Sequence, residues 1–193
     1  MDNNTALVVV DARPSITEEP DLLKLVKTIV VIDHHRQSSE IITNATLSYV
    51  EPYASSACEL VAEILQYVAD SIRIKSPEAD AMYAGIVIDT NNFTNQAGVR
   101  TFEAAAFLRR NGADVTRVRK LFRDSMEDYK ARAEAVRQAE VYKKCFAISV
   151  CPAEAVESPT VVGAQAANEL LDIVGMKHLS VLTPYEGKIY ISA

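Results

Sequence analysis

The sequence is poor in the residue types that crosslink a protein or carry it into a membrane. Its 193 residues include three cysteines and no tryptophan. Cys58, Cys145 and Cys151 are not spaced as a Cys-x-x-Cys pair, so we expect reduced thiols in a cytosolic compartment rather than a zinc site or a disulfide framework. No apolar stretch approaches the roughly 20 residues that a membrane-spanning helix needs, and no signal peptide opens the chain. We therefore expect a polypeptide that is soluble as given.

Positive charge is also in the minority. The chain has 20 Lys and Arg residues against 26 Asp and Glu residues, which gives a formal net charge of −6. A protein with this balance lacks the global positive field that attracts long nucleic acid, and we exclude long nucleic acid as a partner. A small phosphorylated ligand stays open, because its site can be locally cationic or contain a metal ion.

The most informative stretch is an apolar, β-branched run that ends abruptly in polar groups. Residues 28–32 read Thr-Ile-Val-Val-Ile, and Asp33, His34 and His35 follow directly. We call these three residues the polar triplet. Burying them without partners would cost several kcal/mol, and two of the chain's three histidines stand side by side here. A metal or phosphate site explains the polar triplet better than packing does.

A second apolar run, residues 7–10, ends at Asp11. A short amphipathic helix predicted over residues 21–27 separates it from the run that ends at the polar triplet. Strand, helix and strand with tight connections predict a βαβ unit with two parallel neighbouring strands. Because ligands bind at the carboxyl ends of the strands in an open parallel sheet, we expect Asp11 and the polar triplet to lie on one edge.

Helical patterns dominate the rest of the first two thirds of the chain. Residues 85–89 read alone resemble a third strand, but the start signal Ser76-Pro77-Glu78 and the helical spacing of apolar residues favour a helix that ends at Asp89. Another predicted helix opens at residues 54–56, with Ser55 or Ser56 as its N-cap, and runs to about residue 70. Further helices are predicted over residues 101–110, 114–122 and 125–143.

The last 50 residues predict a smaller α/β piece. A strand over residues 145–150 and a helix over residues 163–174 precede a hairpin of residues 178–183 and 188–192. Three strands make a thin core, so we expect this piece to be incomplete. The predicted fold class is α/β, with a parallel sheet in the first domain.

The candidate site combines carboxylates with imidazoles, and each member also has a plainer explanation. Asp11 and Asp89 each close an apolar segment, where an Asp is often only a turn or cap residue. His178 lies beside an apolar strand, and we assign it a structural place only. Oxygen and nitrogen ligands without thiolates suit Mn²⁺, Mg²⁺, Fe²⁺ or Zn²⁺. Two such ions ~3.5–4 Å apart would activate a water molecule and stabilise a leaving oxygen at phosphorus.

The polar triplet matches the name-giving motif of the DHH phosphoesterase superfamily. Residues 49–60, 84–93 and 98–105 resemble the GdpP (YybT) type of cyclic-di-AMP phosphodiesterase. The end of the chain, residues 145–193, resembles the front half of the DHHA1 domain of that family. The resemblance implies three parts, which are a DHH domain over residues 1–124, a linker helix over residues 125–143 and a partial DHHA1 domain over residues 144–193.

The resemblance also implies an activity and roles for individual residues. The activity is a Mn²⁺-dependent phosphodiesterase that opens cyclic-di-AMP to linear pApA. Asp11 would bridge two metal ions, with His34 and Asp89 as further ligands. His35 would face the phosphate, and Asp33 would orient the histidines from outside the ligand set. Further substrate contacts are expected at Ser55, Ser56 and Arg100. The alternative for the two serines is that they only cap their helix, and the alternative for Arg100 is that it is only a solvated charge.

Two motifs of the family have no counterpart here. The sequence contains neither a His-x-x-x-Asp-x-Asp motif before the strand that ends at Asp11 nor an Arg-Ser pair followed by a Gly-Gly-Gly-His loop. We therefore expect a fragment that hydrolyses cyclic-di-AMP weakly or not at all. For the parent protein, the resemblance implies a membrane anchor with this part on the cytoplasmic side, and a homodimer remains an open expectation.

Other functions stay open at this point. The same metal site would serve a phosphatase of 3′-phosphoadenosine phosphate or a hydrolase of very short RNA. A single-stranded DNA exonuclease is disfavoured, because the acidic chain has no run of Lys and Arg interleaved with aromatic residues. A non-catalytic nucleotide-binding module would bind its ligand whether or not a chelator is present.

Overall fold

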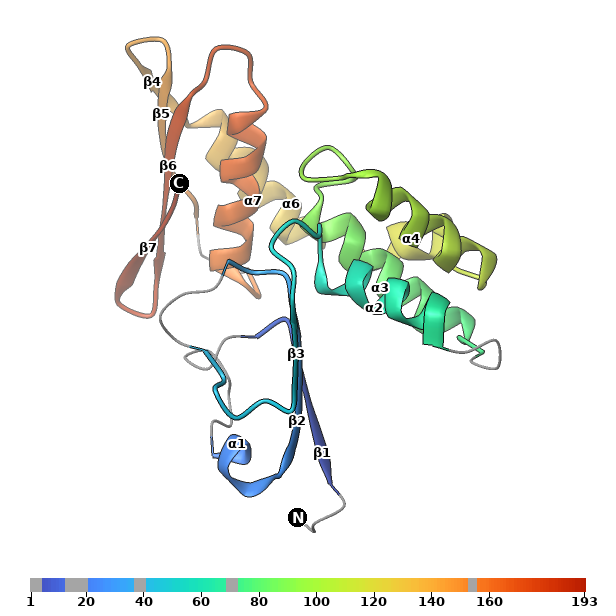
Figure 1. The fold of residues 1–193 in the computed structure, drawn as a ribbon. Helices are drawn as coiled ribbons and strands as arrows, with labels where there is room; N and C mark the ends of the chain where they lie inside the picture. The colour runs from blue at the N-terminus through green and yellow to red at the C-terminus, as the bar shows by residue number, and fades with distance from the viewer. Residues whose placement is uncertain (1–4, 13–20, 37–40, 69–72, 153–155) are drawn as a thin grey trace. The chain divides into compact units, whose positions relative to one another are not determined.

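The structure is a computed structural model that describes residues 5–12, 21–36, 41–68, 73–152 and 156–193. By their internal contacts the residues divide into two compact units, Met1–Leu121 and Phe122–Ala193. Both units contain strands and helices (Figure 1), and the predicted α/β fold class is confirmed.

The first unit contains a parallel sheet of three strands. These are β1 (Ala6–Val10), β2 (Thr28–Asp33) and β3 (Leu47–Val50), in the order β1-β2-β3. The predicted parallel pairing of the first two strands is confirmed, and Val10 lies opposite Ile32. The sequence prediction missed β3, because an alternating pattern over only four residues is at the lower limit of what identifies a strand.

Alternation along β2 decides which of its side chains are buried. Ile29, Val31 and Asp33 are buried, while the residues between them are half-buried. Ile29 and Val31 form an apolar cluster with Val9 of β1 and with Val26, which follows the single-turn helix α1 (Leu22–Leu25). Since side chains two apart point to the same face of a strand, the Asp33 carboxylate ends a buried apolar row.

Helices make up the rest of the first unit. The four helices are α2 (Ala57–Val68), α3 (Ser76–Asp89), α4 (Val99–Arg110) and α5 (Val115–Leu121). In Figure 1, α2, α3 and α4 lie side by side, and their contacts agree. The expected helix ending at Asp89 is confirmed, and the expected end of α2 near residue 70 lies outside the described residues. The shared core is built mostly from small residues, namely Ala62, Ala79, Ile86, Ala104, Leu108 and Ala113.

Local capping explains where three of these helices begin. The Ser56 hydroxyl accepts a hydrogen bond from the backbone N–H of Glu59 at 3.0 Å. The Glu78 carboxylate accepts one from the N–H of Lys75 at 2.8 Å, and Asp114 accepts one from Arg117 at 2.8 Å. Each bond satisfies a donor at a helix start that would otherwise have no partner.

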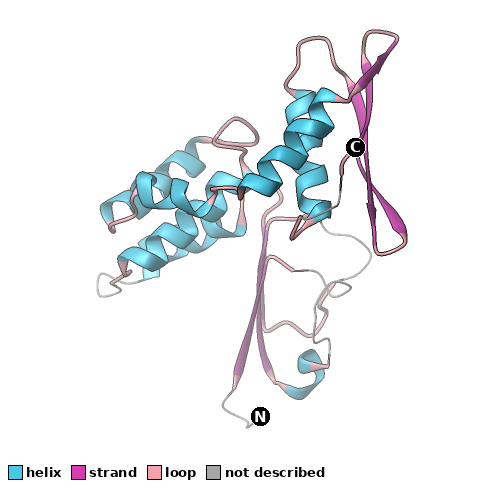
Figure 2. Ribbon diagram, turned by 180° about the vertical axis from the view of Figure 1, so that it is seen from behind, coloured by secondary structure: helices cyan, strands magenta, loops and turns pink. Residues whose placement is uncertain are grey.

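The second unit packs two helices on a four-stranded sheet. The strands β4 (Glu140–Tyr142), β5 (Phe146–Val150), β6 (His178–Tyr185) and β7 (Lys188–Ser192) are neighbours in that order. The helices α6 (Met126–Arg137) and α7 (Pro159–Leu171) share a core with β5 and β6, and Figure 2 shows these helices (cyan) beside the strands (magenta). The hairpin about Glu186 and Gly187 is confirmed.

One predicted helix is too long. The helix expected over residues 125–143 ends at Arg137, and Glu140–Tyr142 pairs with β5 as the antiparallel strand β4. Lys143 and Lys144 turn the chain with φ angles of 49° and 62°. The alternating charges of residues 125–143 are compatible with a helix or a strand. The strand β4 forms because the edge of β5 offers hydrogen-bonding partners to its backbone.

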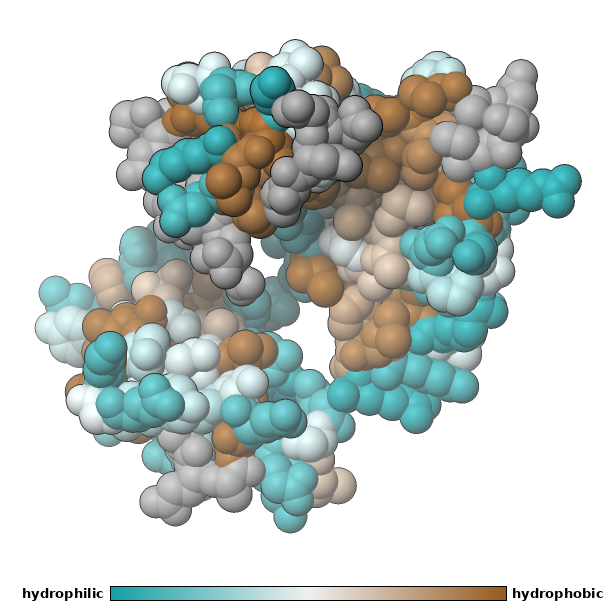
Figure 3. Space-filling model, turned by 90° about the horizontal axis from the view of Figure 1, so that it is seen from below, coloured by the Kyte–Doolittle hydropathy of each residue, from teal (hydrophilic) through white to brown (hydrophobic). Residues whose placement is uncertain are grey.

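Each unit also leaves apolar side chains on its surface. Phe146, Ile148 and Val150 of β5 are exposed, whereas Ala147 between them is buried under the helices. Figure 3 shows hydrophobic (brown) surface gathered in patches between hydrophilic areas on the face seen from below. Among the residues that the structure describes, no helix is long and apolar enough to cross a bilayer.

The close approach of α2 to α3 depends on a missing side chain at Gly85. An added Cβ there would overlap the Sγ atom of Cys58. We predict that Gly85→Ala lowers the free energy of unfolding by about 1–3 kcal/mol, because the small core has no spare volume. In a Cys58→Ala background the same change should cost nothing or stabilise by up to about 1 kcal/mol, since Ala is the better helix former. Urea denaturation of the wild-type protein, the two single variants and the double variant tests this, and an equal cost in both backgrounds would contradict it.

Candidate metal centre

The carboxyl ends of β1 and β2 bring Asp11 and the polar triplet together, as the sequence predicted. The strand register places Val10 opposite Ile32, and the N–H of Asp11 donates to the Ile32 carbonyl oxygen at 3.0 Å. Asp11 then turns out of the strand with a φ of 57°. Asp is one of the few residue types that tolerate this left-handed conformation. The turn leaves its side chain half exposed at the edge of the sheet.

His34 lies between two carboxylates from different elements. Its Nε2 atom is 3.3 Å from Oδ1 of Asp11 and 3.8 Å from Oδ2 of Asp89, the last residue of α3. Thus the C-terminal end of α3 contributes to the site that the sheet begins. His34 is thus near both of the carboxylates that the sequence pairs with it as metal ligands.

Asp33 organises the two histidines. Its Oδ1 atom accepts hydrogen bonds from the backbone N–H groups of His34 and His35 at 2.8 and 3.2 Å. The same oxygen lies 2.7 Å from Nδ1 of His35. A carboxylate held this way favours the tautomer with a proton on Nδ1, which leaves Nε2 of His35 as the free ring nitrogen. Asp33 itself is buried, and all three of these contacts use the same carboxylate oxygen.

The donor set fits a divalent cation. One ligand atom from each of Asp11, His34 and His35 lies within 4.8 Å of the others. Oxygen and nitrogen ligands sit about 2.0–2.2 Å from a metal ion, so two ligands of one ion are typically ~3–3.5 Å apart. The separations of His34 Nε2 from Asp11 and Asp89 are close to this range. Because no thiolate takes part, the site favours hard or borderline metal ions.

The electrostatics of the site also favour a bound cation. Burial raises the pKa of the Asp89 carboxyl, and Asp11 adds to this effect while His34 opposes it. Burial, followed by the charges of Asp89 and Asp11, raises the pKa of the Cys58 thiol to about 11. In the absence of a cation, Cys58 is therefore a protonated neighbour of the site. A cation would relieve the crowding of the carboxylates.

The structure places Ser55 and Ser56 in a buried network at the start of α2. The Ser55 hydroxyl donates to Oε2 of Glu59 at 2.5 Å, and the Thr101 hydroxyl donates to the same oxygen at 2.6 Å. Ser56 caps α2, which is the alternative that the sequence left open. Both serines are buried, and the hydroxyl proton of Ser55 is already used by Glu59.

Arg100 is held by an acid that the sequence did not suggest. Its Nε atom donates to Oε1 of Glu63 on α2, and its Nη2 atom donates to Oε2, each at 2.7 Å. The hydrogen bonds to Glu63 raise the pKa of the guanidinium further. No recorded contact among the described residues joins Arg100 to Asp11 or to the polar triplet. A role in substrate binding would require Arg100 to exchange this partner.

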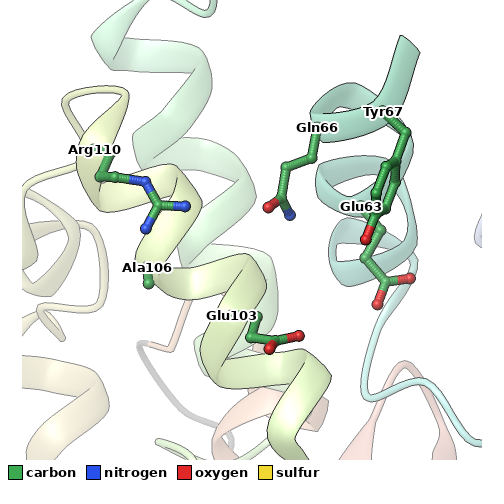
Figure 4. Close-up of a pocket in the computed structure, with 6 residues that line it drawn as sticks. All are labelled: Glu63, Gln66, Tyr67, Glu103, Ala106 and Arg110. Carbon is green, nitrogen blue, oxygen red and sulfur yellow. The ribbon is translucent and has the colours of Figure 1, made fainter.

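A separate cavity of about 350 Å³ lies between α2 and α4. Figure 4 shows Arg110, Gln66 and Glu103 reaching toward the space between the two helices. The cavity is lined by Glu63, Gln66, Tyr67, Glu103, Ala106 and Arg110. None of these residues belongs to the candidate metal centre. The cavity is open and mostly polar, and we assign it no role.

The sequence prediction omits the turn that follows Asp89. Thr90 is completely buried there, and Asn91 and Asn92 are exposed with positive φ angles. The signal was present in the sequence as an Asn-Asn pair directly after a carboxylate that closes an apolar helix. It was overlooked because Asn is common in turns of every kind.

Comparison with known proteins identifies relatives of the chain. Residues 1–86 match the DHH family, N-terminal domain. The cyclic-di-AMP phosphodiesterase GdpP of Bacillus subtilis is 42% identical over 173 residues, which are 89% of this chain and 26% of that protein. The cyclic-di-AMP phosphodiesterase GdpP of Geobacillus thermodenitrificans is 42% identical over 192 residues, which are 98% of this chain and 29% of that protein.

A solved structure supports the fold independently. The crystal structure of an exopolyphosphatase-related protein from Bacteroides fragilis superposes with a TM-score of 0.83. The alignment covers 96% of this chain and 57% of that one, at 20% sequence identity. At this identity the likeness concerns the fold alone.

The chain spans about a quarter of the length of the curated relatives that it matches. The match to the DHH family covers β1, β2 and β3 with Asp11 and the polar triplet, and it ends within α3. The chain is therefore similar to the DHH family over residues 1–86 and to cyclic-di-AMP phosphodiesterases over nearly its whole length.

Proposed function

We propose that Asp11, His34 and Asp89 hold a divalent metal ion, and that the protein to which this chain belongs hydrolyses cyclic-di-AMP to linear pApA. The observation that carries the proposal is the position of the His34 imidazole between the Asp11 and Asp89 carboxylates, 3.3 and 3.8 Å away. Similarity to relatives that are named cyclic-di-AMP phosphodiesterases supplies the substrate.

Charge explains why a cation belongs to the proposal. Asp11, Asp33 and Asp89 place three carboxylates around one edge, and such a surface would repel a phosphate diester. A bound divalent cation would supply Lewis-acid polarisation of the phosphoryl group and a water molecule of lowered pKa. The lack of a thiolate in the donor set agrees with Mn²⁺, which is the ion that we propose.

His35 and Asp33 have distinct tasks in this proposal. Asp33 holds Nδ1 of His35 at 2.7 Å and both backbone N–H groups of the histidine pair, so the imidazole cannot rotate freely. The free Nε2 of His35 then faces the phosphate, where it can accept a proton or, once protonated, donate a hydrogen bond to a phosphoryl oxygen. Asp33 acts only by orienting the ring.

The remaining parts of the proposal concern the larger protein. We propose a DHH domain that ends near residue 124 and a partial DHHA1 domain over residues 144–193, with α6 between them. Membrane anchoring of the parent protein and its association as a homodimer belong to the same proposal and rest on the family resemblance alone. Ser55, Ser56 and Arg100 stay in it as substrate contacts that require a rearrangement of their present partners.

The metal site can be tested without any catalysis. We predict that His34→Ala weakens Mn²⁺ binding at least about 100-fold, because it removes the ligand that lies between the two carboxylates. His178→Ala is the matched control, since this third histidine stacks on Phe146 in the second unit and should leave the affinity unchanged. Isothermal titration with MnCl₂ measures both. Equal affinity of His34→Ala and the wild-type protein would overturn the assignment.

The ligand is tested by titration with cyclic-di-AMP in the presence of Mn²⁺ and again after EDTA treatment. We expect binding with Mn²⁺ and a loss of at least about tenfold in affinity with EDTA, because the phosphate then meets uncompensated carboxylates. Binding that is insensitive to the chelator would instead indicate a non-catalytic nucleotide-binding module. No binding under either condition would contradict the proposed substrate.

A further inference from the structure

The turn that follows the metal ligand Asp89 has an uncommon backbone. Asn91, Asn92 and Phe93 have φ angles of 45°, 58° and 63°, so three successive residues other than glycine are left-handed. A single left-handed Asn just past a helix end is ordinary. A run of three is not, because each side chain crowds its own backbone in this conformation, and a bulky residue such as Phe93 suffers most.

Contacts on both sides hold this turn in place. The hydroxyl of the fully buried Thr90 donates to the Ile86 carbonyl oxygen at 2.6 Å and accepts from the N–H of Phe93 at 2.9 Å. The Phe93 ring stacks on Phe102 of α4 at a centroid distance of 5.5 Å. It also lies 5.9 Å from the ring of Tyr83 on α3. The unfavourable backbone is therefore imposed by the packing around it.

The backbone of this turn has no need of the two asparagine side chains. The N–H groups of Asn91 and Asn92 close the end of α3 by donating to the carbonyl oxygens of Ile88 and Val87, at 3.1 and 2.9 Å. Glycine would make the same bonds with less strain. Both side chains are exposed, and no hydrogen bond of either carboxamide is recorded among the described residues. The structure thus holds two carboxamides beside Asp89 without an internal use for them.

We propose that the carboxamides of Asn91 and Asn92 donate hydrogen bonds to the phosphoryl oxygens of the nucleotide bound beside Asp89. This inference rests on the proposed function. The Cα atom of Asn91 lies within ~7 Å of that of Asp89, because two residues separate them at most that far. The phosphoryl group is the part of the ligand nearest to the metal ligands, and each carboxamide carries two N–H donors.

Neutral donors suit this place better than charged ones. A Lys or Arg beside Asp11 and Asp89 would pair with their carboxylates and compete with the metal ion. A carboxamide offers weaker bonds to those carboxylates and stays available for the phosphate. Donors fixed by a rigid turn also lose little freedom when the ligand binds.

Substitution by glycine separates a ligand contact from a backbone requirement. Asn91→Gly and Asn92→Gly remove the carboxamides and relieve the left-handed backbone at the same time. Gln96→Gly is the matched control, because Gln96 is also exposed and left-handed, with a φ of 52°, but lies seven residues beyond Asp89. For each variant, thermal unfolding, Mn²⁺ affinity and affinity for cyclic-di-AMP with saturating Mn²⁺ are measured.

We expect both asparagine variants to keep or raise the wild-type Tm and to keep the Mn²⁺ affinity within about twofold. Their affinity for cyclic-di-AMP should fall about tenfold or more, as for a lost hydrogen bond to a charged group. Gln96→Gly should bind the nucleotide as the wild type does. Unchanged nucleotide affinity in both asparagine variants overturns the inference, and so does a parallel loss of Mn²⁺ affinity. If the wild-type protein shows no Mn²⁺-dependent nucleotide binding, the proposed function fails and this inference falls with it.

Discussion

The parallel register of β1 on β2 is the constraint on which the rest of the site depends. With Val10 opposite Ile32, Asp11 and the polar triplet leave the sheet side by side at one edge. A slip of one residue would turn Asp33 away from its buried row and break its bonds to His34 and His35. The apolar residues that fix this register, Ile29 and Val31, therefore position the catalytic candidates without touching a ligand.

Charge governs what this edge can bind. Three carboxylates from three elements meet two imidazoles, and the pKa of Asp89 is raised by burial before any ligand arrives. Such a site favours a cation, and it would repel a phosphate unless a cation were bound. Around it, buried bonds hold the chain in place, with Glu59 joining the start of α2 to Thr101 of α4 and Thr90 closing the end of α3. The helices thus supply a rigid frame for the edge.

Much of this site could be predicted from the sequence, because it follows from local patterns. β-branched runs that end in Asp11 and Asp33 predict parallel strands, and the rule for carboxyl ends brings those ends together. The strands β3 and β4 were missed, since each exists only through its partner strand. The bond of Ser55 to Glu59 is local, four residues apart, and was overlooked. The ion pair of Arg100 with Glu63, 37 residues apart, and the bond of Thr101 to Glu59 depend on how α2 packs on α4. No periodicity in the sequence reports such contacts.

The most direct test of this account is to locate the metal ion itself. Crystals of the chain soaked in MnCl₂ and measured near the manganese absorption edge give an anomalous map that marks each bound ion. The account predicts a peak bounded by Nε2 of His34, Oδ1 of Asp11 and Oδ2 of Asp89, with Asp33 still bonded to His35. A map without a peak at this edge, or with manganese bound only elsewhere on the chain, would contradict it.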